Sequence, residues 1–411
     1  MSLRAARLLD VASGSYVDNK VVVVKNGLIE LVADSAPDGC QVMDLGDRTL
    51  LPGLIDAHTH IFLHSNRMFQ VRERTTTEYQ LLEEYPAHRI ARCVRAMRIA
   101  LGHGFTTMRD LGTEGSNYDD VGLRDAVDEG VIPGPHMLVA GPALTSTGSY
   151  KIVHYRPDWP FPTAVMTATG PDECRKAIRI QASYGINWLK VYASSGYGTE
   201  LTKDGYIDAP PNWTPEELQA IVEEAHARGL KVAAHATTIT GTRMAINAGV
   251  ESIEHAHTIP PDLAEVMAAK GIFAVPTLTT SINTAKGIAG PVPPIWAEIP
   301  RVQARSLQNC RAAGVKVAMG TDAGSGSIPW THVNQVVELQ NQVDLGLEPM
   351  ESIRTATTTA AELLGLREVA GMIRPGFRAD IVAVPGDPLS DVGVLSQIDF
   401  VMKDGEVFRQ D

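Results

Sequence analysis

The sequence predicts an α/β protein, namely a (β/α)8 barrel joined to a small β-sandwich domain that both ends of the chain build together. Three observations predict this fold. An Ala-rich helical stretch, a Gly and a short apolar strand follow one another seven times along the 411 residues. One more apolar strand precedes these units, and the two chain ends carry hairpin patterns instead. Eight strands that alternate with helices give the count and order of this barrel.

The two chain ends read as β-hairpins. The first 51 residues alternate short β-branched runs with Ser-Gly, Asn-Gly and Asp-Gly turn signals, and residues from about 372 to 411 repeat this pattern. No low-complexity linker separates either end from the central part. We therefore expect residues 1–51 and 372–411 to form one small β domain, and residues 52–371 to form the barrel.

The barrel is expected to begin with the stretch LPGLIDAHTHIF, residues 51–62. A strand turns alternate side chains to the same face, so His58 and His60 project on one side, about 7 Å apart. Two neutral imidazoles that converge from one strand form half of a metal site. The alternative is two unrelated histidines on a solvated strand face, and the rest of the chain has to decide between them.

The remaining strands come from the seven repeated units. They are RIALGHGFTTMRD, RDAVDEGVIPGPHMLVAG, IQASYGINWLKVYAS, EAHARGLKVAAHA, AINAGVESIEHA, VMAAKGIFAVPT and CRAAGVKVAMGTD. A Gly just past a helix adopts the left-handed cap conformation at little cost, and a continuous apolar run suits a strand that is buried on both faces. A doubly wound open sheet is the alternative, because a linear pattern does not reveal whether the strands close into a ring.

In a barrel of this kind the chemistry lies at the carboxyl ends of the strands. Polar residues stand on five of the eight predicted strands: His58, His60, Lys190, His235, His255, His257 and Asp322. Each alone has an ordinary explanation, such as a hydrogen-bonded barrel histidine, a helix-capping aspartate or a lysine that reaches the surface. If there were no shared site, all of these ordinary explanations would have to be true at once, for residues at the same end of one barrel. A buried unpaired ammonium is also costly, so Lys190 needs a partner or a modification.

These residues resemble the amidohydrolase superfamily. The resemblance rests on D-x-H-x-H after strand one, a strand-four Lys, one His after each of strands five and six, and Thr-Asp after strand eight. It covers nearly the whole chain, including IEHAHTI, MGTDAG and GMIRPGFRADIVAV. It implies two divalent metal ions and a Lys190 that is carbamylated by CO2, which also removes the buried positive charge. By that mapping His58, His60 and Asp322 hold one ion, His235 and His255 hold the other, and Lys190 bridges both.

Nitrogen and oxygen ligands without thiolate favour zinc, with manganese, cobalt or iron as alternatives. Asp56 and Thr321 are candidates for orienting the ligands through hydrogen bonds. Two ions about 3.5–4 Å apart can share a hydroxide, because a metal-bound water has a pKa near 7. The resemblance then implies amide hydrolysis by this bridging hydroxide, with Asp322 as the general base that later protonates the departing amine.

Within the superfamily, the strings WLKVYASSG, EHAHT and GPALTSTGSY look most like dipeptidase and carboxypeptidase-type members. Those members release a C-terminal amino acid from Xaa-Pro, Xaa-Arg or other N-acyl amino acids, and ochratoxin hydrolases belong to the same neighbourhood. Such substrates carry a free carboxylate, which needs a donor or a cation. We expect His257, Tyr192 and His154 to make this contact. Further candidates are Tyr150, Lys151, Tyr197 and the apolar segment HYRPDWPFPTAVM.

Three alternative functions stay open. The first is a one-metal deaminase and the second is a cyclic amide hydrolase, both of the same superfamily. Deaminases of this superfamily usually carry a Glu three residues after the strand-five histidine, where this chain has Thr238. The third is a non-catalytic structural member of the superfamily. The presence of a suitable residue at every ligand position argues against it. Metal content and the released product would distinguish the three.

Composition argues against several kinds of partner. The formal net charge of −12 is the wrong sign for nucleic acid or an anionic membrane, both of which attract basic patches. With 44% hydrophobic and 20% charged residues, the chain has a globular profile. The four cysteines are far apart in sequence, so neither a disulfide framework nor a thiolate zinc cluster is indicated.

No apolar run reaches the length of a membrane helix, and the first residues carry no signal-peptide pattern. This predicts a cytoplasmic protein as the chain is displayed, or a secreted or periplasmic one if a leader had been trimmed before MSL. The resemblance implies a homo-oligomer, and an eight-subunit ring is one form compatible with it.

Overall fold

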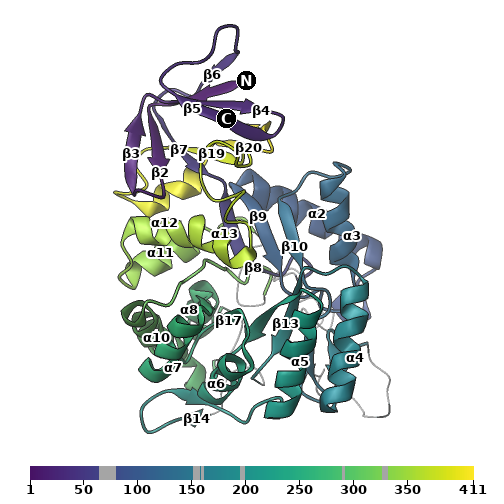
Figure 1. Cartoon of the computed structure of the whole chain (residues 1–411). Coiled ribbons are helices and arrows are strands. Elements are labelled where there is room, and N and C mark those ends of the chain that lie inside the picture. Colours follow the sequence, from purple (N-terminus) through teal and green to yellow (C-terminus); the bar gives the residue numbers. More distant parts are fainter. Residues whose placement is uncertain (64–79, 151–157, 159–161, 195–199, 289–291, 326–331) are drawn as a thin grey trace.

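The computed structural model describes residues 1–63, 80–150, 158, 162–194, 200–288, 292–325 and 332–411. The larger sheets fall into two groups, one at the top of the view in Figure 1 and the other below it, among the helices. One group contains strands from both chain ends, and the other contains parallel strands from the middle of the chain. This is a mixed α/β fold.

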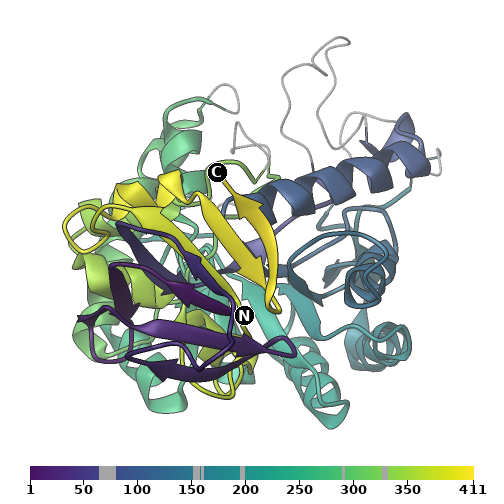
Figure 2. The ribbon, with the colours of Figure 1, turned by 90° about the horizontal axis from the view of Figure 1, so that it is seen from above.

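The first group consists of two sheets. The four-stranded sheet has the order β5 (Leu28–Ala33), β4 (Val21–Lys25), β1 (Ser2–Arg4), β6 (Val42–Asp44). The six-stranded sheet has the order β21 (Glu406–Gln410), β20 (Phe400–Lys403), β19 (Ile381–Pro385), β7 (Arg48–Pro52), β2 (Arg7–Asp10), β3 (Ser15–Asp18). Strand β19 pairs antiparallel with β7, so the two chain ends share one sheet, as the view from above also shows (Figure 2). Leu3, Val22, Leu50, Ile381 and Phe400 belong to one buried cluster.

The second group consists of parallel strands, which follow the order of the chain except that β12 lies at the edge beside β11. One sheet joins β8 (Leu54–Thr59), β9 (Phe105–Asp110) and β10 (His136–Val139). The other has the order β12 (Met166–Ala168), β11 (Leu144–Ser146), β13 (Trp188–Tyr192), β16 (Lys231–His235), β17 (Ser252–Glu254), β18 (Phe273–Val275). Strands β11 and β12 are additions that the sequence pattern did not predict. They lie between β10 and β13 in the chain.

The expected eighth strand is an extended segment rather than a regular strand. It makes isolated parallel bridges from Val317 to Ala274 and from Ala323 to Thr59. Backbone hydrogen bonds also join residues 316–323 to β18 on one side and to β8 on the other, including one of 2.7 Å from the Asp322 N–H to the His58 carbonyl. Another, from the Asn187 N–H to the Val139 carbonyl at 2.9 Å, links the two parallel sheets.

Helices connect and cover the parallel strands. In chain order they are α2 (Pro86–Gly102), α3 (Asp119–Asp128), α4 (Gly170–Ser183), α5 (Pro215–Ala227), α6 (Ile239–Ala248), α7 (Pro261–Lys270), α8 (Leu278–Ala285), α9 (Pro294–Ala297), α10 (Ile299–Ala313), α11 (Val337–Asp344), α12 (Pro349–Thr355) and α13 (Thr358–Leu364). A 3₁₀ helix, η2 (Val392–Gln397), precedes β20, and a short hairpin, β14 (Glu200–Leu201) with β15 (Ile207–Asp208), follows β13.

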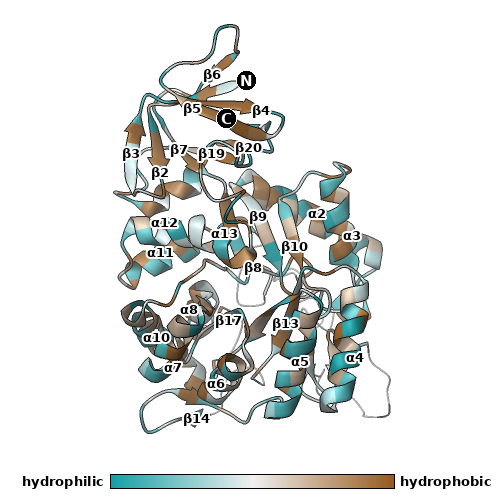
Figure 3. Cartoon of the chain, in the orientation of Figure 1, coloured by the Kyte–Doolittle hydropathy of each residue, from teal (hydrophilic) through white to brown (hydrophobic). Residues whose placement is uncertain are grey.

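Helix ends and burial follow the sequence signals. Gly271 and Gly314 end α7 and α10 in the left-handed conformation, with φ of 71° and 79°, as predicted for a Gly just past a helix. Helices such as α4 and α5 alternate apolar and polar bands (Figure 3), and their buried residues pack on β13 and β16 in one core cluster. All six residues of β8 are buried, as expected for a strand that is covered on both faces. In the described part of the chain, no helix combines the length and apolarity needed to cross a bilayer.

Candidate metal centre and active site

The carboxyl end of β8 and the end of the segment 316–323 bring His58, His60 and Asp322 together. Asp322 Oδ1 lies 3.2 Å from Nε2 of His60 and 3.6 Å from Nε2 of His58. One ligand atom of each residue lies within 4.8 Å of the others, and all three side chains are buried. The hydrogen bond from Asp322 N–H to the His58 carbonyl sets the two segments in register, so the backbone itself places the carboxylate beside the imidazoles.

Lys190 comes from the middle of β13 and points into the same cluster. Its Nζ lies 3.4 Å from Nε2 of His58, and the residue is 1% exposed. Burial lowers the pKa of Lys190 to about 8. Burial, reinforced by the charge of Lys190, also lowers the pKa of His58 to about 4, although Glu254 acts in the opposite direction. The cluster therefore presents a neutral imidazole and an amine that gives up its proton easily.

His235 and His255, at the ends of β16 and β17, complete the group. The ring of His255 lies 4.9 Å from that of His58 and 4.5 Å from that of His235, centroid to centroid. Nδ1 of His255 is 2.9 Å from Oγ1 of Thr277. The structure thus brings together all six residues that the sequence singled out as metal ligands.

Two residues that sequence reasoning missed hold His58 in place. Oε2 of Glu254 lies 2.7 Å from Nδ1 of His58, and Oε1 accepts a 2.8 Å hydrogen bond from Arg109. Burial alone would raise the pKa of Glu254, but Arg109 and the bond with His58 outweigh it and lower that pKa to about 2. Arg109 itself lies over the Trp188 ring, 4.3 Å from its centroid. The one signal for Glu254 in the sequence is a charged residue at the end of a short strand, directly before His255.

Asp56 joins the two segments that carry His58 and Asp322. Its carboxylate accepts hydrogen bonds from the Thr321 hydroxyl at 2.6 Å, from the Thr321 N–H at 3.1 Å and from the His58 N–H at 3.1 Å. It also accepts one from Gln335 at 2.6 Å. Burial raises the pKa of Asp56 to about 6. Asp56 and Thr321, which were expected to orient the ligands, hydrogen-bond to each other, and Asp56 also accepts the His58 N–H.

The residues expected to contact substrate are only partly described. The Tyr192 ring lies 4.7 Å from that of His235 and 5.5 Å from that of Tyr150. His257 is buried, and its Nε2 is 3.1 Å from the Ser281 hydroxyl. Burial lowers the pKa of His257 to about 3. His154, Lys151 and Tyr197 lie outside the described residues, as does most of the segment HYRPDWPFPTAVM.

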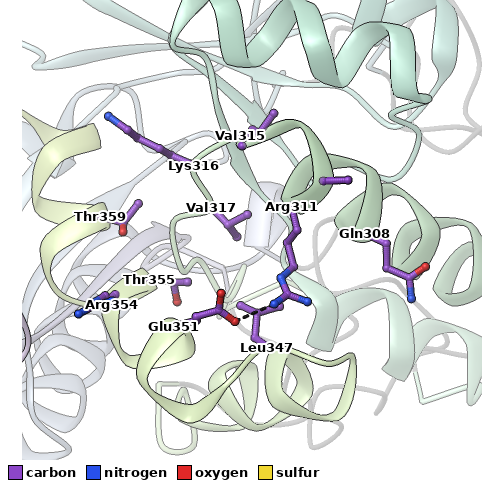
Figure 4. A pocket seen from close by; sticks show the side chains of 12 residues that line it. Gln308, Arg311, Val315, Lys316, Val317, Leu347, Glu351, Arg354, Thr355 and Thr359 are labelled. Atoms are coloured by element: carbon purple, nitrogen blue, oxygen red, sulfur yellow. Dashed lines mark hydrogen bonds and ion pairs between the residues drawn. The ribbon is translucent and has the colours of Figure 1, made fainter. Parts of the chain in front are cut away.

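A cavity of about 610 Å³ opens at the other end of the segment 316–323 (Figure 4). Val317 lines this cavity, and the five residues from there to Asp322 span roughly 17 Å when extended. Arg311 and Glu351 face each other on its wall, with Nη2 and Oε2 2.8 Å apart. None of the predicted site residues lines the cavity, so it is separate from the cluster around His58.

Comparisons with known proteins agree with this geometry. A family model described as "Amidohydrolase family" matches residues 49–408. Ochratoxinase from Aspergillus niger is 30% identical, over 98% of this chain and 86% of its own. A crystal structure of a Xaa-Pro dipeptidase with methionine in its active site has a TM-score of 0.87 at 27% identity, covering 99% of both chains. A prolidase complexed with N-methylphosphonate-L-proline has a TM-score of 0.86 at 28% identity, covering 100% of this chain and 99% of that one.

Proposed function

Because this chain belongs to the amidohydrolase family and is a hydrolase that acts on C–N bonds, we propose that it cleaves the amide bond of dipeptides or N-acyl amino acids and releases a C-terminal amino acid. The observation that carries this proposal is the buried cluster in which Asp322 lies within 3.6 Å of His58 and His60, and Lys190 within 3.4 Å of His58. Aryl amides of the ochratoxin type belong to the same substrate class.

Two divalent ions fit the residues of this cluster. The donors are imidazole nitrogens and a carboxylate without thiolate, a set that favours zinc. The bond of His58 Nδ1 to Glu254 leaves Nε2 directed at Asp322 and Lys190. In the proposed assignment His58, His60 and Asp322 hold one ion, and His235 and His255 the other. When bound, the ions would lower the pKa of a water to about 7 and polarise the amide carbonyl.

Lys190 is proposed to bridge the two ions as a carbamate. The neutral form of an amine is the one that adds CO2, and burial lowers the pKa of Lys190 to about 8. A larger fraction of this amine is therefore neutral near pH 7 than in an exposed lysine, whose pKa is about 10.4. The carbamate product is an anion. A site that binds cations accommodates an anion better than it accommodates an ammonium group.

Asp322 is proposed to carry the proton of the reaction. Burial raises its pKa, but the hydrogen bond and charge of His60 and the neighbouring His58 outweigh that effect and lower it to about 2. The carboxylate is therefore ionised and can take a proton from the attacking water. It then returns that proton to the departing nitrogen, because an unprotonated amine is a poor leaving group.

The proposal also covers the framework of the site. We infer that the eight expected strands close into a barrel, which the hydrogen bonds of residues 316–323 to both β8 and β18 support, together with the bond from Asn187 to Val139. Residues 52–371 would then form the barrel domain, and residues 1–51 with 372–411 the β domain.

A homo-oligomer is proposed from the family. Its small substrate would carry a free carboxylate, and His257, Tyr192 and His154 are the proposed contacts to that carboxylate.

The test is a hydrolysis screen in the presence of zinc and bicarbonate. It uses dipeptides, N-acyl amino acids, aryl amides of phenylalanine, cyclic amides and heterocyclic amines, and it measures the released amino acid or ammonia. We expect an amino acid to be released from linear amides, and Asp322→Asn to slow that release by about 10²- to 10⁴-fold. Release of ammonia from a heterocyclic amine, or opening of a cyclic amide, without cleavage of any linear amide would overturn the proposal.

A further inference from the structure

Glu114 is a buried carboxylate whose position the cluster described above does not explain. It follows β9 on the side of the sheet where the strands end, it is 3% exposed, and its backbone has a φ of 47°. A left-handed conformation is unfavourable for a residue with a side chain, and such strain gathers at functional sites. The main-chain carbonyl of Glu114 accepts a hydrogen bond from Arg89 at 3.0 Å, which holds the loop in this conformation.

The carboxylate of Glu114 lies beside the metal-site residues. The position that a Cβ atom on Gly112 would take is 3.6 Å from Glu114 Oε1 and 3.5 Å from Cε1 of His60. The Gly112 carbonyl is itself 3.3 Å from Nδ1 of His60. A glycine at this place therefore leaves a small gap that the imidazole borders on one side and the carboxylate on the other.

Glu114 also stands at one end of a row of aromatic rings. Its Oε2 accepts a 2.8 Å hydrogen bond from the Tyr150 hydroxyl. The Tyr150 ring packs 5.5 Å from Tyr192, which in turn lies 4.7 Å from His235. This row reaches from Glu114 to a proposed ligand of the second ion, so the carboxylate belongs to the wall of the active site.

Within the described residues, no lysine, arginine or histidine forms an ion pair with this carboxylate, and the Tyr150 hydroxyl is its hydrogen-bond donor. Burial raises the pKa of Glu114, although the charges of His60 and Lys190 act in the opposite direction. A buried carboxylate that lacks an ion-pair partner is costly, and a ligand that brings an ammonium group to it removes part of that cost.

We propose that Glu114 binds the α-ammonium group of the residue on the acyl side of the scissile amide. This inference rests on the proposed function and narrows its substrate class to dipeptides with a free N-terminus, in preference to N-acyl amino acids and aryl amides. In a dipeptide the ammonium and the carboxylate lie on opposite sides of the amide bond. Glu114 follows β9, which neighbours β8 in one parallel sheet, whereas His257 follows β17 in the other parallel sheet, an arrangement that suits a substrate with one charge at each end.

The experiment compares two substrates on the metal-loaded enzyme. One is the alanyl derivative of the amino acid that the enzyme releases, and the other is the propionyl derivative, which differs only in lacking the ammonium group. We expect kcat/KM to be at least about 10-fold higher for the alanyl substrate. Glu114→Gln should lower kcat/KM for the alanyl substrate by about 10- to 100-fold, mainly through KM, because a hydrogen bond to a charged group is lost. It should change the value for the propionyl substrate by less than about threefold.

Tyr150→Phe is the matched variant, because it removes the hydroxyl that binds Glu114 and keeps the carboxylate. It should retain the preference for the alanyl substrate. Equal losses for both substrates in Glu114→Gln, reproduced by Tyr150→Phe, would mean that Glu114 only positions Tyr150, and would overturn the proposal. Equal rates for both substrates in the wild-type enzyme would also overturn it while the proposed function stands. Failure to cleave either substrate, or any other amide, would instead count against the proposed function.

Discussion

Oε2 of Glu254 lies 2.7 Å from Nδ1 of His58, and neither side chain is exposed. A carboxylate at Nδ1 holds an imidazole in the tautomer whose Nε2 is available to a metal ion. Arg109 binds the other carboxylate oxygen at 2.8 Å, so Glu254 cannot turn away without separating a buried ion pair. The orientation of His58 is therefore set by residues of two other strands.

Glu254→Gln should weaken metal binding by about 10- to 100-fold, the usual cost of losing a carboxylate that supports a ligand. A glutamine can present an N–H to His58 Nδ1 where the carboxylate accepts one, which favours the wrong tautomer. Competition with a chelator measures the affinity. Glu223→Gln, at an exposed carboxylate of α5, is the control and should leave the affinity unchanged. An unaltered affinity in Glu254→Gln would show that His58 does not depend on this bond.

Asp322→Asn should keep bound metal and lose turnover by about 10²- to 10⁴-fold, because the amide cannot accept a proton from the attacking water. The asparagine has nearly the same shape, so its oxygen can still face His60, which lies 3.2 Å from the carboxylate in the wild-type chain. Single-turnover rates and metal content should be measured on the same preparation. Wild-type rates in this variant would end the proposed role of Asp322 in proton transfer.

Lys190→Ala should empty the site or bind its ions more loosely, because the carbamate that is proposed to bridge them cannot form. Addition of a short carboxylic acid such as propionate should restore part of the activity by occupying the space beside His58 that Nζ leaves. Lys270→Ala, at an exposed lysine at the end of α7, is the control, and added acid should not affect it. A fully active Lys190→Ala without added acid would contradict the bridging role.

His136 should stabilise the fold in a pH-dependent way. Its Nε2 lies 3.2 Å from Asp380 and 3.4 Å from Asp404. Asp380 precedes β19 and Asp404 follows β20, so these two contacts join β10 to the six-stranded sheet of the chain ends. Burial opposes protonation of His136, but the two carboxylates outweigh it and raise its pKa above the ordinary value of 6.5. A raised pKa means that the stabilisation is fully present below about pH 6.5 and is lost as the pH rises through the higher value of the folded state.

His136→Gln should therefore reduce the free energy of unfolding by about 1–2 kcal/mol at pH 6 and by less at pH 9. Denaturant titrations at the two pH values measure the difference. His226→Gln removes a more exposed contact, whose partner Glu251 lies 3.0 Å away, and should cost less than His136→Gln at pH 6. An equal loss for His136→Gln at pH 6 and pH 9 would mean that packing, rather than charge, accounts for the effect.

The sequence allowed the grouping of His58, Lys190 and Asp322 to be predicted because these residues stand at matching places in repeated units. Gly271 and Gly314 marked the ends of helices, and the apolar runs after them marked strands whose carboxyl ends meet. This local regularity was enough to predict that His58 and Asp322 lie close together, although they are 264 positions apart in the sequence. It did not reveal that residues 316–323 would hydrogen-bond to β8 and β18 without forming a regular strand.

Glu254, Arg109 and Glu114 escaped prediction because each acts through a partner that no local pattern identifies. The bond between His58 and Glu254 joins residues 196 positions apart, and that between Arg109 and Glu254 joins residues 145 positions apart. Periodicity reports which face of an element is buried, but not which charged groups from different strands meet on that face. Such pairs become visible only when the strands are placed side by side.

The pairing of β19 with β7 has a consequence for biosynthesis. On the ribosome β7 emerges early, yet its antiparallel neighbour begins at Ile381 and is made only after the central strands and helices. Until then, one edge of β7 exposes backbone donors and acceptors together with apolar side chains such as Leu50 and Leu51, which are buried in the finished protein. A nascent chain that stalls before residue 385 would therefore expose an unpaired strand edge that can aggregate with other chains. Chaperones that recognise extended apolar segments would be expected to bind this edge.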